Sequence, residues 1–182
     1  MSSLFILGGA RSGKSRHAIA AQSVRGRVTF IATAKPGDGD MAARIARHRA
    51  ERPAHWTTLE EFFDVSARLV ALRSVDAAIV DCVTVWVANL MLRGDANDAI
   101  VAAAEQLGKT LPRCAFDVTL VSNEVGAGVH PETDIGLRFR DLLGIVNQRL
   151  AAASDRVVLM VAGLPLTLKA PAEDHGQPVQ AP

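Results

Sequence analysis

Short apolar runs alternate along the chain with longer amphipathic stretches. Five of these runs are mostly continuous rather than alternating in polarity, and they cover residues 4–7, 28–32, 77–81, 118–122 and 157–162. Continuous apolar runs of this length are typical of parallel strands that are buried on both faces of a sheet. A further segment, 164–169, could form a last short strand that turns back from the fifth run.

The stretches between these runs have the pattern of amphipathic helices. The clearest begins near Pro131 and Glu132, where a proline suits the first helical turn because no backbone donor is needed there. Its apolar side chains at 139, 142, 143, 146 and 150 follow one helix face. This order of elements predicts an α/β fold: a doubly wound, mostly parallel sheet with helices on both faces, in a single domain over residues 1–169. Residues 170–182, with three prolines, are expected to be a disordered tail.

In open sheets of this kind, ligands bind beyond the carboxyl ends of the strands. The predicted strands place four positions at that edge, namely Gly8, Thr33, Asp81 and Asn123. We therefore expect the functional site to be assembled from the loops that follow these residues.

The first of these loops matches the phosphate-loop pattern G-x-x-x-x-G-K-[ST]. Its residues are Gly8, Gly9, Ala10, Arg11, Ser12, Gly13, Lys14 and Ser15. The loop follows a predicted strand and opens a predicted helix, which is the context that the pattern requires. Glycines allow backbone N–H groups to surround phosphate oxygens, Lys14 would reach the β- and γ-phosphates, and Ser15 would ligate Mg²⁺. The loop predicts a P-loop NTPase-like, RecA-like fold that binds a magnesium–nucleoside triphosphate.

Two further strand ends carry polar residues. Asp81 ends a predicted strand, where an acid is the usual second magnesium anchor of such folds, although a lone aspartate there is also often a helix N-cap. Asn123 and Glu124 begin a glycine-rich loop at the same edge. They could bind substrate or orient water, or they could simply form a turn between strand and helix.

An arginine-rich segment, 41–52, has the composition of a helix, with Arg44, His48 and Arg52 spaced along one face. Arginine suits planar phosphate contacts, and a neutral imidazole on such a face is what a histidine nucleophile toward phosphorus needs. The alternative is an ordinary solvated helix face. Among the other histidines, His130, in the loop before the long helix, is a weaker candidate for a site role.

Composition and charge exclude some classes of partner and cellular environment. The net charge is +1, with 20 basic and 19 acidic residues, so the chain has no overall electrostatic attraction to nucleic acid or membranes. No run approaches the roughly 18 apolar residues of a membrane span. Cys82 and Cys114 lack metal-ligand spacing and are expected to be free thiols of a reducing compartment. We therefore expect a soluble, cytoplasmic protein.

Taken together, these motifs resemble the bifunctional adenosylcobinamide kinase/adenosylcobinamide-phosphate guanylyltransferase family of cobalamin biosynthesis. The resemblance covers nearly the whole chain apart from the tail. The matching segments are 8–18, 31–34, 41–56, 81–84 with Asn89, 122–128, 131–132, 138–140, 146–153 and 161–169.

The resemblance implies a P-loop α/β domain that assembles as a homotrimer and carries out two reactions. The first phosphorylates the aminopropanol hydroxyl of adenosylcobinamide with ATP or GTP. The second transfers GMP from GTP to that phosphate, through a guanylylated histidine that corresponds to His48, and gives adenosylcobinamide-GDP and pyrophosphate. By the same match the guanine nucleotide would contact the phosphate loop and Thr33, Ala34, Lys35, Arg49, Ala50, Glu51, Arg52, Glu60 and Asp81.

Two other functions fit parts of the sequence. A simple small-molecule kinase would use the arginine segment only as a substrate clamp. A regulatory GTPase would normally carry a guanine-reading N-K-x-D segment, which this chain lacks. Only the two-step enzyme predicts a covalent nucleotide on a histidine.

Overall fold

The computed structural model describes residues 1–22, 26–35, 52–128 and 130–171. The strands are β1 (Ser3–Gly8), β2 (Val28–Ala32), β3 (Thr57–Glu60), β4 (Ala77–Asp81), β5 (Asp117–Val121), β6 (Arg156–Val161) and β7 (Leu164–Lys169). The helices of the described residues are α1 (Lys14–Ala20), α3 (Val65–Ala71), α4 (Val83–Arg93), α5 (Asn97–Thr110), α6 (Asp134–Ala153) and a short 3-10 helix, η1 (Leu111–Arg113).

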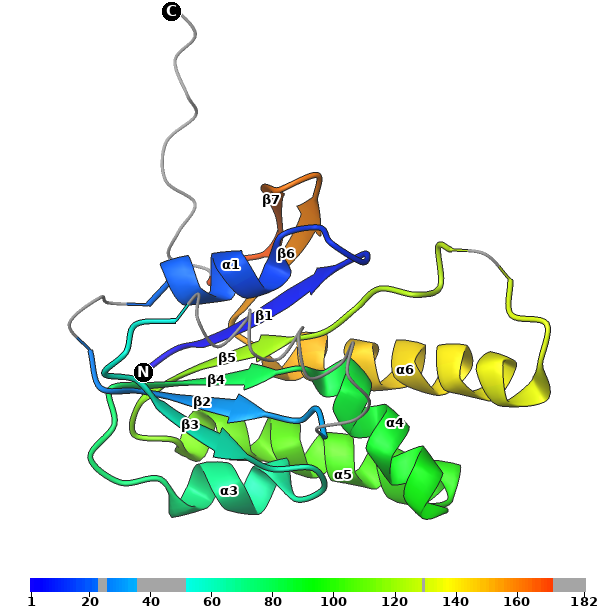
Figure 1. Ribbon diagram of the computed structural model, residues 1–182, viewed down its shortest axis with the longest axis horizontal. Helices are drawn as coiled ribbons and strands as arrows, with labels where there is room; N and C mark the ends of the chain where they lie inside the picture. Colours follow the sequence, from blue (N-terminus) through cyan, green and yellow to red (C-terminus); the bar gives the residue numbers. More distant parts are fainter. Residues whose placement is uncertain (23–25, 36–51, 129, 172–182) are drawn as a thin grey trace, which may run out of the picture.

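The strands form one seven-stranded sheet in the order β3-β2-β4-β5-β1-β6-β7 (Figure 1). All neighbouring pairs run parallel except β6 and β7, which are antiparallel. The prediction of a mostly parallel α/β sheet is therefore confirmed. The order has one consequence for function: β5 lies between β1, which leads into the phosphate loop, and β4, which ends at Asp81.

Both faces of the sheet are covered, as the continuous apolar runs predicted. On one face the sheet is covered by α1 (Figure 1), whose Ala18 belongs to the same buried cluster as Ile6, Phe30 and Val121. On the other face, α3 to α6 bury the larger cluster, which includes the fully buried Trp86 and Leu107. Strand residues consequently alternate between two apolar layers rather than between core and solvent.

The predicted elements differ from the observed ones at two places. The strand β3 was not predicted, because it has four residues, T-T-L-E, of which only Leu59 is a large apolar residue. The long helix α6 begins at Asp134 rather than near Pro131. The side chain of Thr133 accepts a hydrogen bond from the backbone N–H of Gly136 at 3.2 Å and thereby caps the helix. The threonine cap, rather than the proline, sets the start.

Candidate active site

The phosphate loop connects β1 to α1 at the carboxyl edge of the sheet. Gly8 has a φ of +153°, and a Cβ placed on it would lie 2.6 Å from both the Met160 carbonyl oxygen and Ser12 Oγ. Gly13, with a φ of +95°, is the N-cap of α1. The turn between β6 and β7 supports the loop from outside, where the Gly163 N–H donates to the Ser12 carbonyl at 3.1 Å. The backbone geometry of the loop therefore requires glycine at positions 8 and 13.

Lys14 directs its ammonium group into this loop. Its Nζ donates to the Gly9 carbonyl at 2.6 Å and lies 3.5 Å from Ser12 Oγ, and the residue is only 8% exposed. Gly9, Ala10 and Arg11 form the exposed part of the loop. The positive charge is thus held inside a ring of backbone, where the phosphate oxygens of a nucleotide would need it.

Asp81 occupies the last position of β4, and the structure argues against the N-cap alternative. The N-cap of α4 is Cys82, and no side chain caps that helix. The Asp81 Oδ2 atom is buried and accepts no hydrogen bond from the described residues. Buried carboxylate oxygens normally have a partner, so this atom is suited to a ligand that the protein itself does not supply.

These residues fit a Mg²⁺ ion. Within the described part of the chain no three His, Cys, Asp or Glu side chains gather as a metal cage. Mg²⁺ usually needs none, because it is held by one or two protein oxygens together with waters and substrate phosphates. Ser15 lies half-buried in the first turn of α1. Asp81 lies two strand spacings from β1, or about 10 Å, which leaves room for phosphates and an ion between them.

The segment after β2 is placed at the same edge, but its first residue is a structural brace. Thr33 is fully buried, and its hydroxyl donates to the Cys82 carbonyl and accepts from the Cys82 N–H, each at 2.8 Å. Its own carbonyl accepts from the Asn89 amide at 2.8 Å. Nucleotide contacts there would fall to Ala34 and to the exposed Lys35, whose Nζ lies 4.5 Å from the centre of the Phe63 ring.

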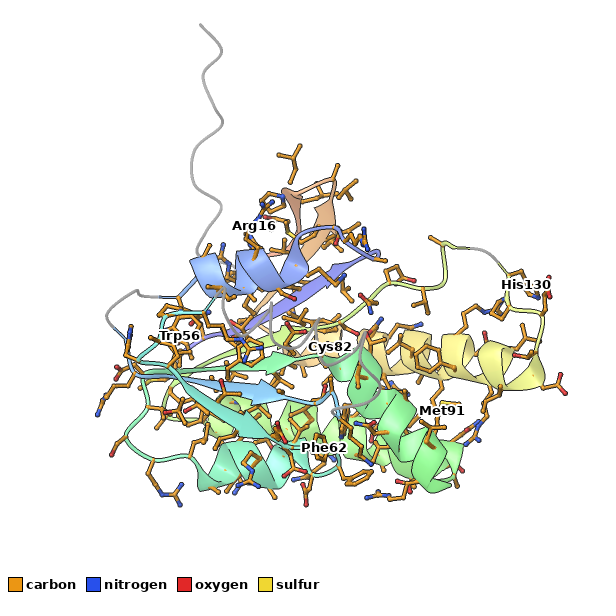
Figure 2. All side chains as sticks on the ribbon, in the orientation of Figure 1. Arg16, Trp56, Phe62, Cys82, Met91 and His130 are labelled. Carbon is orange, nitrogen blue, oxygen red and sulfur yellow. The ribbon has the colours of Figure 1, made fainter. Side chains whose placement is uncertain are left out.

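Cys82 follows Asp81 at the centre of this edge (Figure 2). Burial, followed by the charge of the neighbouring Asp81 carboxylate, raises the pKa of the Cys82 thiol to about 11. The thiol therefore stays protonated at neutral pH, which excludes it as a thiolate nucleophile beside the nucleotide site.

The arginine-rich segment is described only at its end. Arg44, His48, Arg49, Ala50 and Glu51 lie outside the described residues, as do residues 172–182 of the expected tail. Arg52 is in a bend rather than in the expected helix. Its guanidinium carbon lies 3.3 Å from the centre of the Phe30 ring, and its Nη1 donates to Thr58 Oγ1 at 3.2 Å. Glu60 is exposed at the end of β3.

His130 lies well away from this edge, beside the start of α6 (Figure 2). Its Nδ1 is 2.8 Å from Nη1 of Arg140, and the residue is exposed. The structure does not bring it together with the phosphate loop, and so favours a surface role.

Sequence reasoning missed the polar side chains that hold the end of β5. Ser122, Thr84 and Asn147 are all buried, and they hydrogen-bond to one another and to the backbone of Asn123. One signal was available in the sequence: Asn147 falls within the apolar stripe of the long helix, four residues after Leu143. A polar residue in such a stripe indicates a buried partner.

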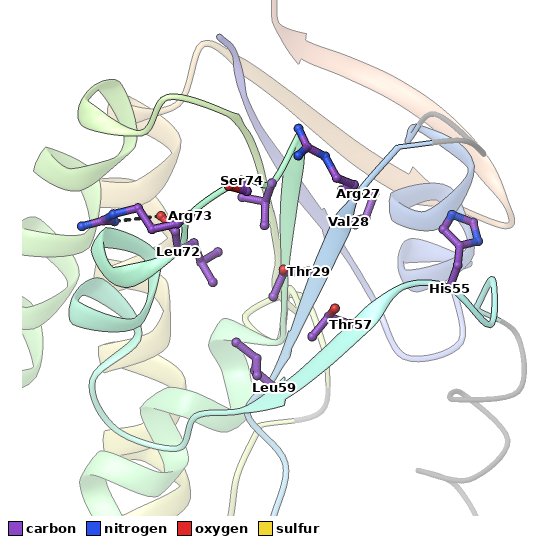
Figure 3. Close-up of a pocket in the computed structure, with 10 residues that line it drawn as sticks. Arg27, Val28, Thr29, His55, Thr57, Leu59, Leu72, Arg73 and Ser74 are labelled. Atoms are coloured by element: carbon purple, nitrogen blue, oxygen red, sulfur yellow. Dashed lines mark hydrogen bonds between the residues drawn. The ribbon is translucent and has the colours of Figure 1, made fainter.

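A cavity of about 380 Å³ lies elsewhere, at the amino end of β2 and β3 (Figure 3). It is lined by Arg27, Val28, Thr29, His55, Thr57, Leu59, Leu72, Arg73, Ser74 and Val75. Because the phosphate loop is at the carboxyl edge, this cavity is not part of the candidate site.

The comparisons with known proteins agree with the geometry of the carboxyl edge. Residues 4–168 match the sequence profile of the family described as cobinamide kinase / cobinamide phosphate guanyltransferase. The chain belongs to this family. A cobinamide kinase / guanyltransferase is an enzyme with two reactions, which agrees with a phosphate loop in a sheet whose edge offers further polar groups.

Relatives match over almost their whole length. The bifunctional adenosylcobalamin biosynthesis protein CobP of Pseudomonas aeruginosa is 46% identical over 167 residues, which are 90% of this chain and 95% of that protein. The bifunctional adenosylcobalamin biosynthesis protein CobU of Salmonella typhimurium is 42% identical over 179 residues, covering 91% and 99%. The protein of the same name from Escherichia coli is 40% identical, with the same coverage.

A solved structure supports the fold. An ATPase from the type III secretion system of pathogenic bacteria superposes with a TM-score of 0.53 at 9% identity, covering 91% of this chain. The chain spans 56% of that ATPase chain. At this identity the likeness concerns the fold alone, and it agrees with the predicted P-loop NTPase-like architecture. In the described ranges, no helix is long and apolar enough to cross a bilayer.

Proposed function

We propose that this family member phosphorylates the aminopropanol hydroxyl of adenosylcobinamide and then transfers GMP from GTP to the new phosphate. The observation that carries the first step is the phosphate loop, with Lys14 held inside it. The match of residues 4–168 to a kinase and guanyltransferase family supports both steps. We propose both ATP and GTP as donors for the kinase step.

In the kinase step, backbone N–H groups of the loop would hold the triphosphate and Lys14 would stabilise charge on its β- and γ-phosphate oxygens. Ser15 and Asp81 are the residues that would hold Mg²⁺, which supplies charge neutralisation on the phosphates when it is bound. The aminopropanol hydroxyl attacks the γ-phosphorus, and the nucleoside diphosphate leaves.

In the second step, a ring nitrogen of His48 would attack the α-phosphorus of GTP and release pyrophosphate. The phosphate of adenosylcobinamide phosphate would then take the GMP group from the histidine. Two easier displacements thereby replace one difficult one. Arg44, Arg49 and Arg52 are the cations proposed to stabilise the developing charge. We propose nucleotide contacts for Ala34, Lys35, Ala50 and Glu51, and for Glu60 at the end of β3.

The alternative is a simple kinase in which the arginine segment only clamps the substrate. Incubation with α-labelled GTP, followed by denaturation, separates the two. We expect a covalent label that is labile in acid and comparatively stable in base, as for a phosphoramidate. His48→Asn should lose the label and guanylyl transfer while keeping much of the kinase activity. A label that persists in His48→Asn and vanishes in His130→Asn would refute the assignment of the nucleophile.

We also propose a homotrimer in the cytoplasm. The edge strand β7 supports assembly, because Leu164, Leu166 and Leu168 are 71%, 55% and 55% exposed on it. An uncovered edge strand can pair with another chain, and exposed apolar patches often mark protein–protein interfaces. Light scattering should give three times the mass of one chain, and Leu166→Lys should lower that mass. A monomeric wild type would contradict this proposal.

Free thiols at Cys82 and Cys114 agree with a reducing compartment.

A further inference from the structure

Asn123 lies next to the phosphate loop, in the gap between that loop and Asp81. Val121, the last residue of β5, pairs with Ile6 of β1 on one side and with Asp81 of β4 on the other. The register continues past the end of the strand, because the Glu124 N–H donates to the Gly8 carbonyl at 3.0 Å. Asn123 is therefore level with Gly8, one strand spacing, or about 5 Å, from the first residue of the loop.

The backbone of Asn123 is fixed by a closed ring of hydrogen bonds. Its N–H donates to Thr84 Oγ1 at 2.6 Å, and its carbonyl accepts from the Asn147 amide at 3.1 Å. The Ser122 hydroxyl donates to Asn147 Oδ1 at 2.8 Å. Because this bond uses the only proton of that hydroxyl, the 3.3 Å contact between the two hydroxyls runs from Thr84 to Ser122. Each member of the ring both donates and accepts.

This ring of hydrogen bonds stabilises the fold only if every polar group in it has a partner. Ser122 is fully buried, and Thr84 and Asn147 are 7% and 5% exposed. Unsatisfied polar groups in such a place would destabilise the fold, whereas a complete network is rigid. The side chains of α4 and α6 thus hold residue 123 where sheet pairing with β4 has stopped, so the direction of its side chain is set by the fold.

That direction is toward the face of the sheet that α1 covers. Val121 packs into the apolar layer beneath α1, whereas Ser122 contacts α4 and α6. Because consecutive side chains of an extended chain point to opposite faces, Asn123 shares the face of Val121, which is the face that α1 and Lys14 cover. Asn123 is half-buried. Its hydrogen bonds with the described residues are made by its backbone N–H and carbonyl.

We propose that the side-chain amide of Asn123 donates a hydrogen bond to the γ-phosphoryl group during the kinase step; this rests on the proposed function. In that step a bond forms from the alcohol oxygen to the γ-phosphorus, and the bond from that phosphorus to the β–γ bridging oxygen breaks. The electron pair stays on the diphosphate, and the hydroxyl proton passes to solvent. The side-chain N–H of Asn123 stabilises the charge on the transferred group together with the Lys14 ammonium group.

The neighbouring Glu124 does not have this role. Its Oε1 accepts from the Gly126 N–H at 2.7 Å, and the residue is exposed. The carboxylate therefore closes the glycine-rich turn. Of the two residues that sequence analysis considered at this position, the geometry selects the asparagine.

The test compares Asn123→Ala with Asn123→Asp in two assays. One assay follows γ-phosphoryl transfer to adenosylcobinamide, and the other follows guanylyl transfer to adenosylcobinamide phosphate supplied directly. Removal of one donor to a developing anion typically lowers kcat by about 100-fold, and we expect this for the kinase reaction of Asn123→Ala. Guanylyl transfer, which reacts at the α-phosphorus, should fall at least about tenfold less.

Asn123→Asp should be the worse kinase of the two, because it places a negative charge beside the phosphate at almost unchanged shape. If Asn123 only fills space, Asn123→Ala should instead have the lower kinase activity of the two variants. That result would overturn the inference. Asn97→Ala, an exposed asparagine that bonds to Arg138, is the matched control and should keep both activities. A wild type with no kinase activity refutes the proposed function, whereas an active wild type with unaffected Asn123 variants refutes this inference alone. Thermal unfolding of each variant identifies any loss of fold, and Asn123→Asp retains the side-chain volume.

Discussion

The two edges of the sheet use charge in opposite ways. At the amino edge, Arg27 and Asp76 satisfy each other, with Nη2 and Oδ1 2.7 Å apart. Arg73 donates to the backbone carbonyls of Val70 and Leu72, and Figure 3 shows the bond to Leu72. At the carboxyl edge, Lys14 is turned into a loop of backbone, and Asp81 Oδ2 is buried without a hydrogen bond from the described residues. These charged groups of the amino edge have partners within the chain, whereas Asp81 at the carboxyl edge has a buried oxygen that is suited to a ligand.

The 380 Å³ cavity and the candidate active site therefore lie at different edges of the sheet. The 380 Å³ cavity is at the amino edge, where the charged groups already have partners. The carboxyl edge is marked instead by Gly8, where nothing larger than glycine fits, and by the buried Asp81 Oδ2, which accepts no hydrogen bond from the described residues. The glycine loop together with a buried, unpaired carboxylate oxygen therefore marks the candidate site more directly than this cavity does.

The largest effect should come from Lys14. Lys14→Ala should abolish adenosylcobinamide phosphorylation, with a loss of about 1,000-fold or more, because it removes the cation that faces the β- and γ-phosphates. Steady-state kinase assays measure this. Lys109→Ala, an exposed lysine of α5, is the control and should leave turnover unchanged. Normal turnover in a folded Lys14→Ala variant would contradict the assignment of Lys14 as the cation that binds phosphate at the carboxyl edge.

Gly8→Ala should disable the same loop through shape rather than charge. The added Cβ would lie 2.6 Å from the Met160 carbonyl oxygen, which belongs to a strand and cannot move freely. We expect a free energy of unfolding lower by about 1–3 kcal/mol, together with loss of kinase activity. Gly9→Ala is the control for stability, because its Cβ would meet nothing within 4 Å. Equal unfolding midpoints of the two variants in a denaturant titration would contradict the close contact at Gly8.

Asp81→Asn tests the buried carboxylate. The Mg²⁺ concentration for half-maximal kinase activity should rise by about tenfold or more, since even changes outside the inner ligands weaken metal sites on that scale. Asp98→Asn, in the exposed first turn of α5, should leave the magnesium titration unchanged. An unchanged titration in Asp81→Asn would mean that the unpaired oxygen has another purpose.

The sequence was sufficient for the sheet and the phosphate loop because both depend on local patterns. Continuous apolar runs predict parallel strands, and glycines with a lysine at fixed spacing predict a loop around phosphate. It was not sufficient for Thr33, which appeared as a ligand position and proved to be a buried brace for Cys82. Nor did it reveal the ring around Asn123, because that ring joins residues 84, 122 and 147 through tertiary packing. The position of Asn147 in an apolar stripe indicates that it has a buried partner, but one sequence does not show which residues are the partners.

The smallest effect should come from the amino edge, where the Arg27–Asp76 pair is exposed. Side-chain and backbone hydrogen bonds from Arg27 lower the pKa of Asp76 to about 2. A lowered carboxyl pKa stabilises the fold above the ordinary value, near 4, and this contribution is lost as the pH falls toward 2. An NMR titration of Asp76 should show the low pKa, and Arg27→Ala should raise it toward the ordinary value. The variant should keep kinase turnover and almost all stability at pH 7, because exposed ion pairs contribute little. A clear loss of kinase activity in Arg27→Ala would show that the amino edge takes part in function, and the separation of the two edges would no longer hold.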